Sequence, residues 1–285
     1  MNRTGISYVD MSWNPVTGCS PVSAGCANCW AKQRAIQNAA AGSCWYDPAD
    51  PFKPTFHPGR LGEPIARRKP AIIAVGFMGD LFHPDIPVED ARKIIKAMRE
   101  ANHHAYLILT KRPERISEVL WDKNPDPHIW YGATVESGRT AAVRMRYMKG
   151  LAQQGYKVWI SAEPLLADLD QEVRLEHWFQ CPRCQGKGFL AERHIFCDRC
   201  GGTGFEPEDK RIGWVIVGCE SGPGRRPMNE DWARKILNEC ARCRVPFFLK
   251  QMQVGNKVQA HPAPALDGRT FEQVPRAILE HVGRL

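Results

Sequence analysis

The sequence predicts an α/β protein, specifically a partial (β/α)6–7 TIM-like barrel of parallel strands with a small inserted zinc ribbon. Three observations predict this fold. Short apolar runs alternate with helical patterns along most of the chain, which is typical of a parallel sheet. The runs are continuously apolar, as in a sheet that is covered on both faces. Polar residues follow nearly every run, as they do at the carboxyl-terminal rim of an α/β barrel.

The elements follow one another in a regular order. Apolar runs rich in β-branched and aromatic residues predict strands, over residues 8–13, 71–75, 105–109, 129–133, 157–160, 214–217 and 245–249. Patterns of helical period predict helices between several of them, over residues 31–40, 88–102, 140–154 and 229–243. We expect the barrel to comprise residues 1–176 and 211–285, and the zinc ribbon to comprise residues 177–210.

Composition and charge narrow the class of protein. The chain has 285 residues, of which 43% are hydrophobic and 25% charged, as in an ordinary globular protein. No apolar stretch approaches the roughly 20 residues that cross a membrane, and the first residues lack the apolar core of a signal peptide. Eleven cysteines in such a chain predict a cytoplasmic protein that keeps thiolates as metal ligands. The net charge of +8 favours a polyanionic partner.

Four cysteines form the one internal repeat that we find. They lie in two C-x2-C pairs separated by 12 residues, each followed by glycines: Cys181, Cys184, Cys197 and Cys200. Four thiolates at this spacing fill the shell of a structural zinc ion, and the glycines let the backbone turn tightly behind each pair. The alternative is a redox-active C-x2-C, which does not need the duplication. The repeated C-x2-C-x-G-x-G resembles half of the zinc-binding module of J-domain co-chaperones.

Three further cysteines lie in a turn-rich loop after the first predicted strand. Cys19, Cys26 and Cys29 offer three soft ligands, and three ligands leave one coordination position open, as a catalytic metal centre requires. Acidic residues are absent from positions 11–46, which favours thiolates. Two alternatives remain: a zinc ion with Cys44 as fourth ligand, and buried free cysteines.

Polar residues at the ends of the other predicted strands are the second candidate site. Their recurrence at one structural offset predicts a common rim, to which the cysteine loop also belongs. The candidates are the glycine-containing loop with Gly76, Met78, Gly79 and Asp80, and then Lys111, Arg112, Glu136, Ser137, Glu163, Glu220 and Lys250.

These stretches together resemble a phage-associated family of uncharacterised function that is usually grouped with the radical SAM enzymes. The matching segments run through most of the chain: 13–19, 25–29, 79–83, 109–115, 161–166, 217–223, 247–251 and 266–270. The resemblance implies that Cys19, Cys26 and Cys29 hold a [4Fe-4S] cluster whose fourth iron binds S-adenosylmethionine. It also implies an external electron donor. The first gap of the cysteine motif is longer here than the usual C-x3-C-x2-C, and the aromatic Trp30 follows the third cysteine.

The resemblance also suggests roles for the rim residues. The loop containing Gly76, Met78, Gly79 and Asp80 would lie along the methionine amino group. Lys111 or Arg112 would bind the methionine carboxylate, because both side chains donate hydrogen bonds to anions. Glu136 and Ser137 would hold the ribose hydroxyls. Glu163, Glu220 and Lys250 lie further round the barrel, and we assign them to catalysis on the substrate.

Charge and the predicted ribbon are the only pointers to a substrate. Positions 138–162 contain no acidic residue, and basic groups lie there and at 60–69 and 225–226, with aromatic residues nearby. Phosphate contacts and base stacking need such groups, so we expect a nucleic acid or nucleotide base, modified or repaired, with the ribbon projecting from the rim as a clamp. The alternatives are a non-catalytic zinc protein that binds nucleic acid and a radical enzyme acting on a peptide or protein. We expect Cys240 and Cys243 to be buried rather than ligating. Cys219, next to Glu220 on the rim, would be a small core residue, with a hydrogen donor as the alternative.

Overall fold

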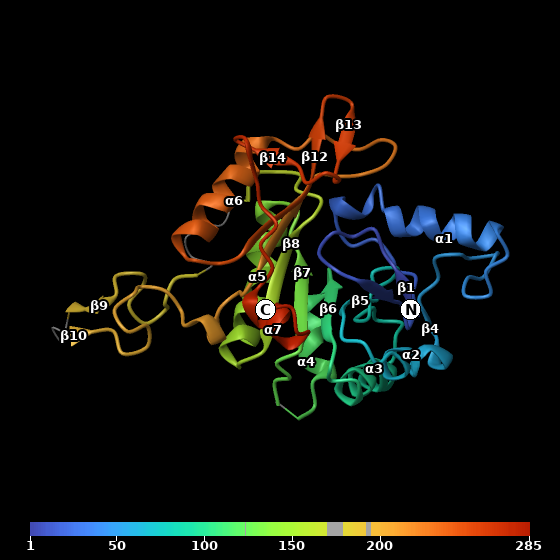
Figure 1. Ribbon diagram of the computed structural model, residues 1–285, viewed down its shortest axis with the longest axis horizontal. Helices are drawn as coiled ribbons and strands as arrows, with labels where there is room; N and C mark the ends of the chain where they lie inside the picture. The colour runs from blue at the N-terminus through green and yellow to red at the C-terminus, as the bar shows by residue number, and fades with distance from the viewer. Residues whose placement is uncertain (123, 170–178, 192–194) are drawn as a thin grey trace.

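The architecture is that of a computed structural model, which describes residues 1–122, 124–169, 179–191 and 195–285 (Figure 1). A nine-stranded sheet forms its centre, in the spatial order β1 (Asn2–Arg3), β2 (Met11–Trp13), β5 (Ile72–Val75), β6 (Ala105–Thr110), β7 (Ile129–Thr134), β8 (Lys157–Ala162), β11 (Val215–Gly218), β12 (Phe247–Val254) and β13 (Lys257–Gln259). The seven strands from β2 to β12 are parallel and adjacent in chain order. The predicted α/β class with parallel strands is therefore confirmed.

The sheet is open, since β1 and β13 pair antiparallel at its two edges and no closed barrel forms in the described residues. Helices connect the parallel strands: α1 (Trp30–Ala40), α2 (Glu63–Ala66), α3 (Val88–Glu100), α4 (Ile116–Val119), α5 (Gly138–Gln153) and α6 (Glu230–Arg242). A short helix, α7 (Arg276–His281), lies near the carboxyl terminus. Three two-stranded ribbons complete the fold: β3 (Val16–Thr17) with β4 (Thr55–Phe56), β9 (Phe189–Leu190) with β10 (Ile195–Phe196), and β14 (Ala265–Leu266) with β15 (Arg269–Thr270).

Both faces of the sheet are covered, as continuously apolar strands require. All residues of β5, β7 and β11 are buried. On the inner face, Tyr8, Trp159, Trp214 and Phe248 pack together, mostly edge to face, and α7 packs against the same cluster through Ile278. Gly132 is required here, because a Cβ atom at this position would lie 2.3 Å from the Trp159 ring.

The predicted elements differ from the observed ones mainly at their ends. The first strand is shorter than expected, because Tyr8 lies in a turn and fills the inner cluster instead of extending β2. The last parallel strand, β12, runs further than expected, because its final residues pair with β13 in a hairpin. None of the helices in the described ranges has the length and apolar character needed to cross a membrane. The predicted boundary at 176–177 falls outside the described residues.

Buried histidines make the stability of this fold depend on pH. Burial lowers the pKa of His104 to about 4, from an ordinary value near 6.5, and the pKa of His128 is lowered for the same reason. Because the unfolded chain binds these protons more readily, the free energy of unfolding should fall as the pH drops from about 6.5 to 4. Each unit of pKa depression corresponds to roughly 1.4 kcal/mol.

Urea unfolding between pH 7.5 and 4.5 measures this loss of stability. His104→Gln should flatten the decline, whereas the matched change at exposed His261 should leave it unaltered. Equal pH profiles for wild type and His104→Gln would show that another group causes the decline.

Candidate active site and metal centres

The cysteine loop follows β3 and lies at the carboxyl-terminal edge of the sheet. Backbone hydrogen bonds to two other segments fix its first residues. The Gly18 N–H donates to the Met78 carbonyl at 2.9 Å, and the Cys19 N–H donates to the Phe52 carbonyl at 3.0 Å. A Cβ atom on Gly79 would lie 2.8 Å from the Gly18 carbonyl oxygen. The glycine at position 79 therefore permits a close approach between its own backbone and that of the cysteine loop.

The first side chain that holds the loop is Arg112, which follows β6 and is buried. Its guanidinium donates to Cys19 Sγ at 3.2 Å and to the Ser20 carbonyl at 3.0 Å. It also pairs with the buried Asp80 carboxylate at 3.0 Å, and Thr110 Oγ1 donates to the same carboxylate at 2.7 Å. Arg112 therefore links the ends of β5 and β6 to the first cysteine.

Glu136, which follows β7, holds the middle of the loop. Ser23 Oγ donates to its carboxylate at 2.6 Å, and Arg144 pairs with it at 3.0 Å from α5. Lys111 lies 3.5 Å from the same carboxylate. A Cβ atom on Gly25 would lie 2.5 Å from Glu136 Oε1, so glycine is needed for the loop to pass this side chain.

Glu220, which follows β11, holds the end of the loop. Asn28 Nδ2 and the Arg226 backbone N–H donate to its carboxylate at 2.9 and 2.8 Å, and the Arg226 guanidinium also binds it. Burial alone would raise the pKa of Glu220, but hydrogen bonds from Arg226 and Asn28 outweigh it and lower the pKa to about 2. Arg226 reaches onward to the Ala24 carbonyl at 2.9 Å.

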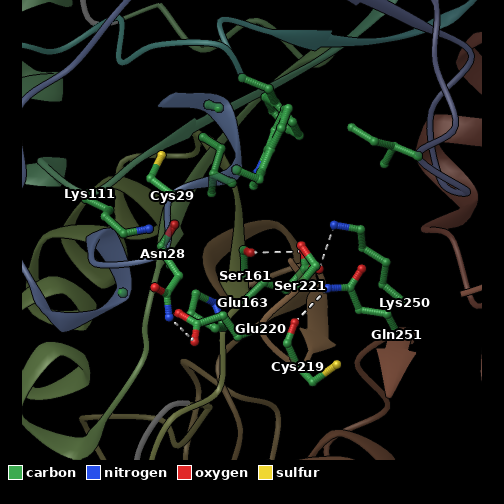
Figure 2. Close-up of a pocket in the computed structure, with 18 of the residues that line it drawn as sticks. Asn28, Cys29, Lys111, Ser161, Glu163, Cys219, Glu220, Ser221, Lys250 and Gln251 are labelled. Carbon is green, nitrogen blue, oxygen red and sulfur yellow. Dashed lines mark hydrogen bonds and ion pairs between the residues drawn. The ribbon is translucent and has the colours of Figure 1, made fainter. Parts of the chain in front are cut away.

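A pocket of about 300 Å³ opens beside the third cysteine (Figure 2). Its walls combine apolar side chains with a few charged ones, as small-molecule sites do. Its lining residues include Cys29, Tyr8, Asp80, Lys111, Glu163 and Lys250. The lining residues come from the cysteine loop and from β5, β6, β7, β8, β11 and β12 or the segments that follow these strands.

Glu163 and Lys250 form an ion pair within this pocket. Lys250 Nζ lies 2.9 Å from Glu163 Oε1, and Ser161 Oγ donates to the other carboxylate oxygen at 3.2 Å. Figure 2 shows the three side chains pointing toward one another, Ser161 and Glu163 from the end of β8 and Lys250 from β12. Burial and the adjacent Glu163 carboxylate raise the pKa of Tyr8 well above its usual value, so its phenol keeps its proton.

The structure separates the rim residues into two groups. Asp80, Lys111, Glu163, Glu220 and Lys250 line the pocket together with Cys29. Among the described residues, the pocket lining does not include Gly76, Met78, Gly79, Arg112, Glu136 or Ser137. Arg112 and Glu136 hold the cysteine loop, and Ser137 caps α5 by accepting a hydrogen bond from the Thr140 N–H.

Two pocket residues received no role from the sequence. Tyr8 reads as the start of a strand, and only its polar hydroxyl in an apolar run distinguishes it. Asn28 lies between Cys26 and Cys29 and donates to Glu220. In the sequence, only its hydrogen-bonding amide next to two cysteines marks it as a site residue.

The three loop thiols are free and partly exposed, and they do not gather as tightly as the ligands of a single ion. Hydrogen-bond donors point at two of their sulfurs: Arg112 at Cys19, and the Val22 N–H at Cys26 with a distance of 3.5 Å. Such donors are typical of iron–sulfur sites, which also spread their thiolates over several irons. Cys44 is exposed.

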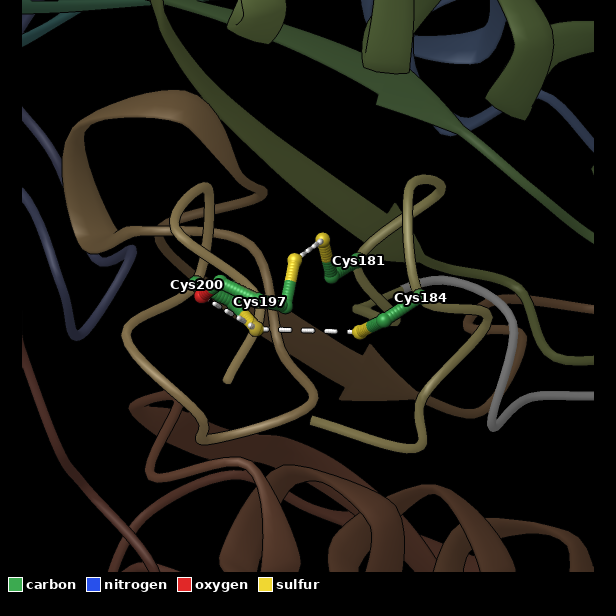
Figure 3. Close-up of side chains that lie close together, drawn as sticks. All are labelled: Cys181, Cys184, Cys197 and Cys200. Atoms are coloured by element: carbon green, nitrogen blue, oxygen red, sulfur yellow. Dashed lines mark hydrogen bonds between the residues drawn. The ribbon is translucent and has the colours of Figure 1, made fainter. Parts of the chain in front are cut away.

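The four cysteines of the predicted zinc ribbon converge on one point (Figure 3). All four are buried, and their sulfurs lie within 4.8 Å of one another. Cys181 and Cys197 are 3.8 Å apart, and Cys184 and Cys200 are 3.7 Å apart. A tetrahedral zinc ion with Zn–S bonds of about 2.3 Å has sulfurs about 3.8 Å apart. The four thiols therefore fit one tetrahedral metal ion.

We call the segment that carries these ligands the four-cysteine unit (residues 179–191 and 195–206). Its base does not lie at the pocket rim, so the expectation that it projects from the rim as a clamp was wrong. Arg242, at the end of α6, stacks over Phe205 at 5.1 Å, and residues 208–210 pack on α5. Because α5 and α6 run antiparallel to the strands, their carboxyl-terminal ends lie toward the opposite edge of the sheet from the pocket. The unit projects sideways from the body (Figure 1).

Cys219, Cys240 and Cys243 are buried in the apolar layer between the sheet and the outer helices, as expected. Cys219 also lines the pocket, next to Glu220 (Figure 2). In the described part of the chain, the only group of cysteines close enough for a single metal ion is that of the four-cysteine unit.

Comparison with known proteins identifies the family. A family model described as "Protein of unknown function (DUF5131)" matches residues 3–275, which is nearly the whole chain. The chain belongs to this family. No curated protein matches. A solved structure, "Spore photoproduct lyase complexed with dinucleoside spore photoproduct", is similar with a TM-score of 0.42 and 11% identity, covering 86% of this chain and 66% of the other, which is just under two thirds of its length.

Proposed function

We propose that this protein is an iron–sulfur enzyme of the radical SAM type. Cys19, Cys26 and Cys29 would hold a [4Fe-4S] cluster, and S-adenosylmethionine would enter the adjoining pocket. The observation that carries the proposal is the placement of three free thiols in one loop, at the carboxyl-terminal edge of a parallel sheet and beside a pocket of about 300 Å³.

The loop suits a cluster better than a single zinc ion. Its thiols do not form a group within single-ion distance in the described residues, and two of its sulfurs receive hydrogen bonds from Arg112 and a backbone N–H. Four buried charged side chains, Arg112, Asp80, Glu136 and Glu220, fix it from neighbouring strand ends. When bound, such a cluster supplies the electron that cleaves S-adenosylmethionine to methionine and a 5′-deoxyadenosyl radical.

The pocket residues would orient the ligand and keep water out. Lys111 lines the pocket and would exchange its 3.5 Å contact with Glu136 for the methionine carboxylate, whereas Arg112 holds the loop. Asp80 would face the methionine amino group. Glu163 and Lys250 form an ion pair with each other. When the substrate binds, both side chains would form hydrogen bonds with its polar groups instead. Phe77 and Leu109 make part of the wall apolar, which excludes water from the reacting atoms.

The proposal also includes a nucleic-acid substrate and a zinc ion in the four-cysteine unit. A net charge of +8 favours a nucleic acid or one of its bases as substrate, modified or repaired in the cytoplasm, with an external protein as electron donor. The four-cysteine unit would hold a zinc ion as a structural module, because tetrahedral sulfur ligation with no open position suits zinc.

Anaerobic reconstitution with iron and sulfide, followed by reduction and EPR, tests the cluster. We expect a [4Fe-4S]⁺ signal that changes on addition of S-adenosylmethionine, and release of 5′-deoxyadenosine. Cys26→Ala should abolish the signal, because a cluster with two thiolates is not retained. The matched change Cys44→Ala should leave it intact, since that thiol is exposed and lies outside the loop.

The opposite pattern would contradict the proposal. Zinc bound at both cysteine groups, no acid-labile sulfide, and loss of one zinc ion in Cys44→Ala would indicate a non-catalytic zinc protein. Salt-insensitive binding of a peptide, with no binding of nucleic acid, would instead indicate a peptide or protein substrate.

A further inference from the structure

The four-cysteine unit carries an exposed aromatic pair at its tip. Phe189 and Phe196 lie directly opposite one another in the β9–β10 hairpin, with ring centroids 6.3 Å apart. Phe196 is 75% exposed and Phe189 is 39% exposed. The other cross-strand pair, Leu190 and Ile195, lies on the opposite face, where Leu190 packs against the four cysteines. The two phenylalanines are not among the side chains that pack against the four cysteines, although the edge of the Phe196 ring lies beside Gly202.

A basic hollow adjoins this aromatic pair. Its volume is about 340 Å³, and Arg183, Lys187 and Phe189 are among the residues that line it. The described lining residues include no acidic side chain. Among the described residues, Asp198 pairs with Arg183 at 3.1 Å and is itself largely exposed, so solvent weakens that pair. Lys187 is exposed.

We propose that this face of the hairpin binds unpaired nucleotides of a nucleic acid strand. The two rings offer stacking surfaces for bases, and the two cations beside them offer contacts for the connecting phosphates, which is the combination that single-strand binding requires. An apolar protein partner would use the rings without needing cations at their edge. The tip is thus a second nucleic-acid site, distinct from the pocket.

The position of the four-cysteine unit defines which part of a strand this site would hold. Phe205 at its base contacts Arg242 at the end of α6, and residues 208–210 pack on α5, away from the pocket. A nucleotide that reacted in the pocket would therefore be a different one from those held on the hairpin. This inference deepens the nucleic-acid part of the proposed function, and it does not depend on the cluster.

Fluorescence anisotropy with labelled single-stranded DNA and RNA of about 30 nucleotides tests the proposal on the full chain. We expect wild-type affinity to fall steeply with salt. Phe189→Ala/Phe196→Ala should weaken binding about tenfold or more for each stacked base that is lost. Ile195→Ala removes a comparably exposed apolar side chain from the other face and should bind as wild type does. Zinc content equal to that of wild type shows that each variant retains its four-cysteine unit.

Three results would overturn the proposal. Binding that is equal in wild type and the double phenylalanine variant would exclude the hairpin. An equal loss in Ile195→Ala would indicate an apolar docking surface for a protein. Wild type that fails to bind either nucleic acid would also exclude the site. The EPR signal of the reconstituted cluster is measured in wild type and in the double variant. If this signal is present in both, these binding results concern the hairpin alone and not the cluster proposal.

Discussion

Replacing Arg112 by methionine should lower the free energy of unfolding by about 3 to 5 kcal/mol, the range expected when one partner of a buried ion pair is removed. Arg112 is 5% exposed and pairs with Asp80, which is 3% exposed. Methionine fills much of the space of arginine but leaves the Asp80 carboxylate without its cation. It also removes the donors to Cys19 Sγ and the Ser20 carbonyl. Urea unfolding at pH 7.5 measures the loss.

Two further variants separate charge from geometry in this test. Arg112→Lys keeps the cation but cannot reach Asp80, Cys19 and Ser20 together, so its loss should be intermediate. Arg276→Met breaks a surface pair with Glu280 and should cost no more than about 0.5 kcal/mol, because that pair is largely exposed. If Arg112→Met were as stable as Arg276→Met, the buried network would not be what fixes the cysteine loop.

The same network should tune a bound cluster. A hydrogen bond to a ligating sulfur stabilises the reduced, more negative state and raises the reduction potential. Arg112→Lys should therefore lower the potential of the reconstituted protein, on the order of 60 mV for a tenfold change in a one-electron equilibrium. An unchanged potential would mean that the contact from Arg112 to Cys19 is lost once the cluster binds.

The sequence was sufficient to predict the central parallel strands because most of them are continuous apolar runs followed by polar residues. Such a run is a local feature of the sequence, so the runs 105–109 and 129–133 map directly onto β6 and β7. The ends that differ were decided by tertiary contacts. Tyr8 leaves the first strand because three aromatic residues, distant in sequence, surround it on the inner face.

The sequence also predicted which side chains would gather at the rim, but not their partners. Glu136 illustrates the reason. A carboxylate after a strand can bind a ligand or the protein itself, and only the fold reveals that Ser23, Arg144 and Lys111 surround it. The ribbon illustrates the same limit. Because the ribbon is inserted between β8 and β11, the sequence suggested that it projects from the pocket rim. In the structure its base instead contacts the end of α6, where Arg242 stacks on Phe205.

Replacing Cys184 by serine should remove the metal ion from the four-cysteine unit and unfold that unit. Structural zinc sites of this type contribute about 10 to 16 kcal/mol of apparent binding energy, and small units of this type lack a core large enough to replace it. The hairpin of β9 and β10 has two residues in each strand and rests on the four cysteines through Leu190. Zinc analysis and limited proteolysis should show no metal in this unit and cleavage within residues 179–211.

The parallel sheet should survive this loss, because its two apolar layers are formed almost entirely by residues outside the unit. We therefore expect a protected core and a cluster signal like that of wild type. Cys243→Ser is the matched control: it changes an equally buried cysteine, which should cost about 1 to 3 kcal/mol for burying a hydroxyl, but leave the zinc content intact. If Cys184→Ser unfolded the sheet as well, the four-cysteine unit would be part of the core rather than an inserted module. If it retained zinc, the ion would be bound elsewhere.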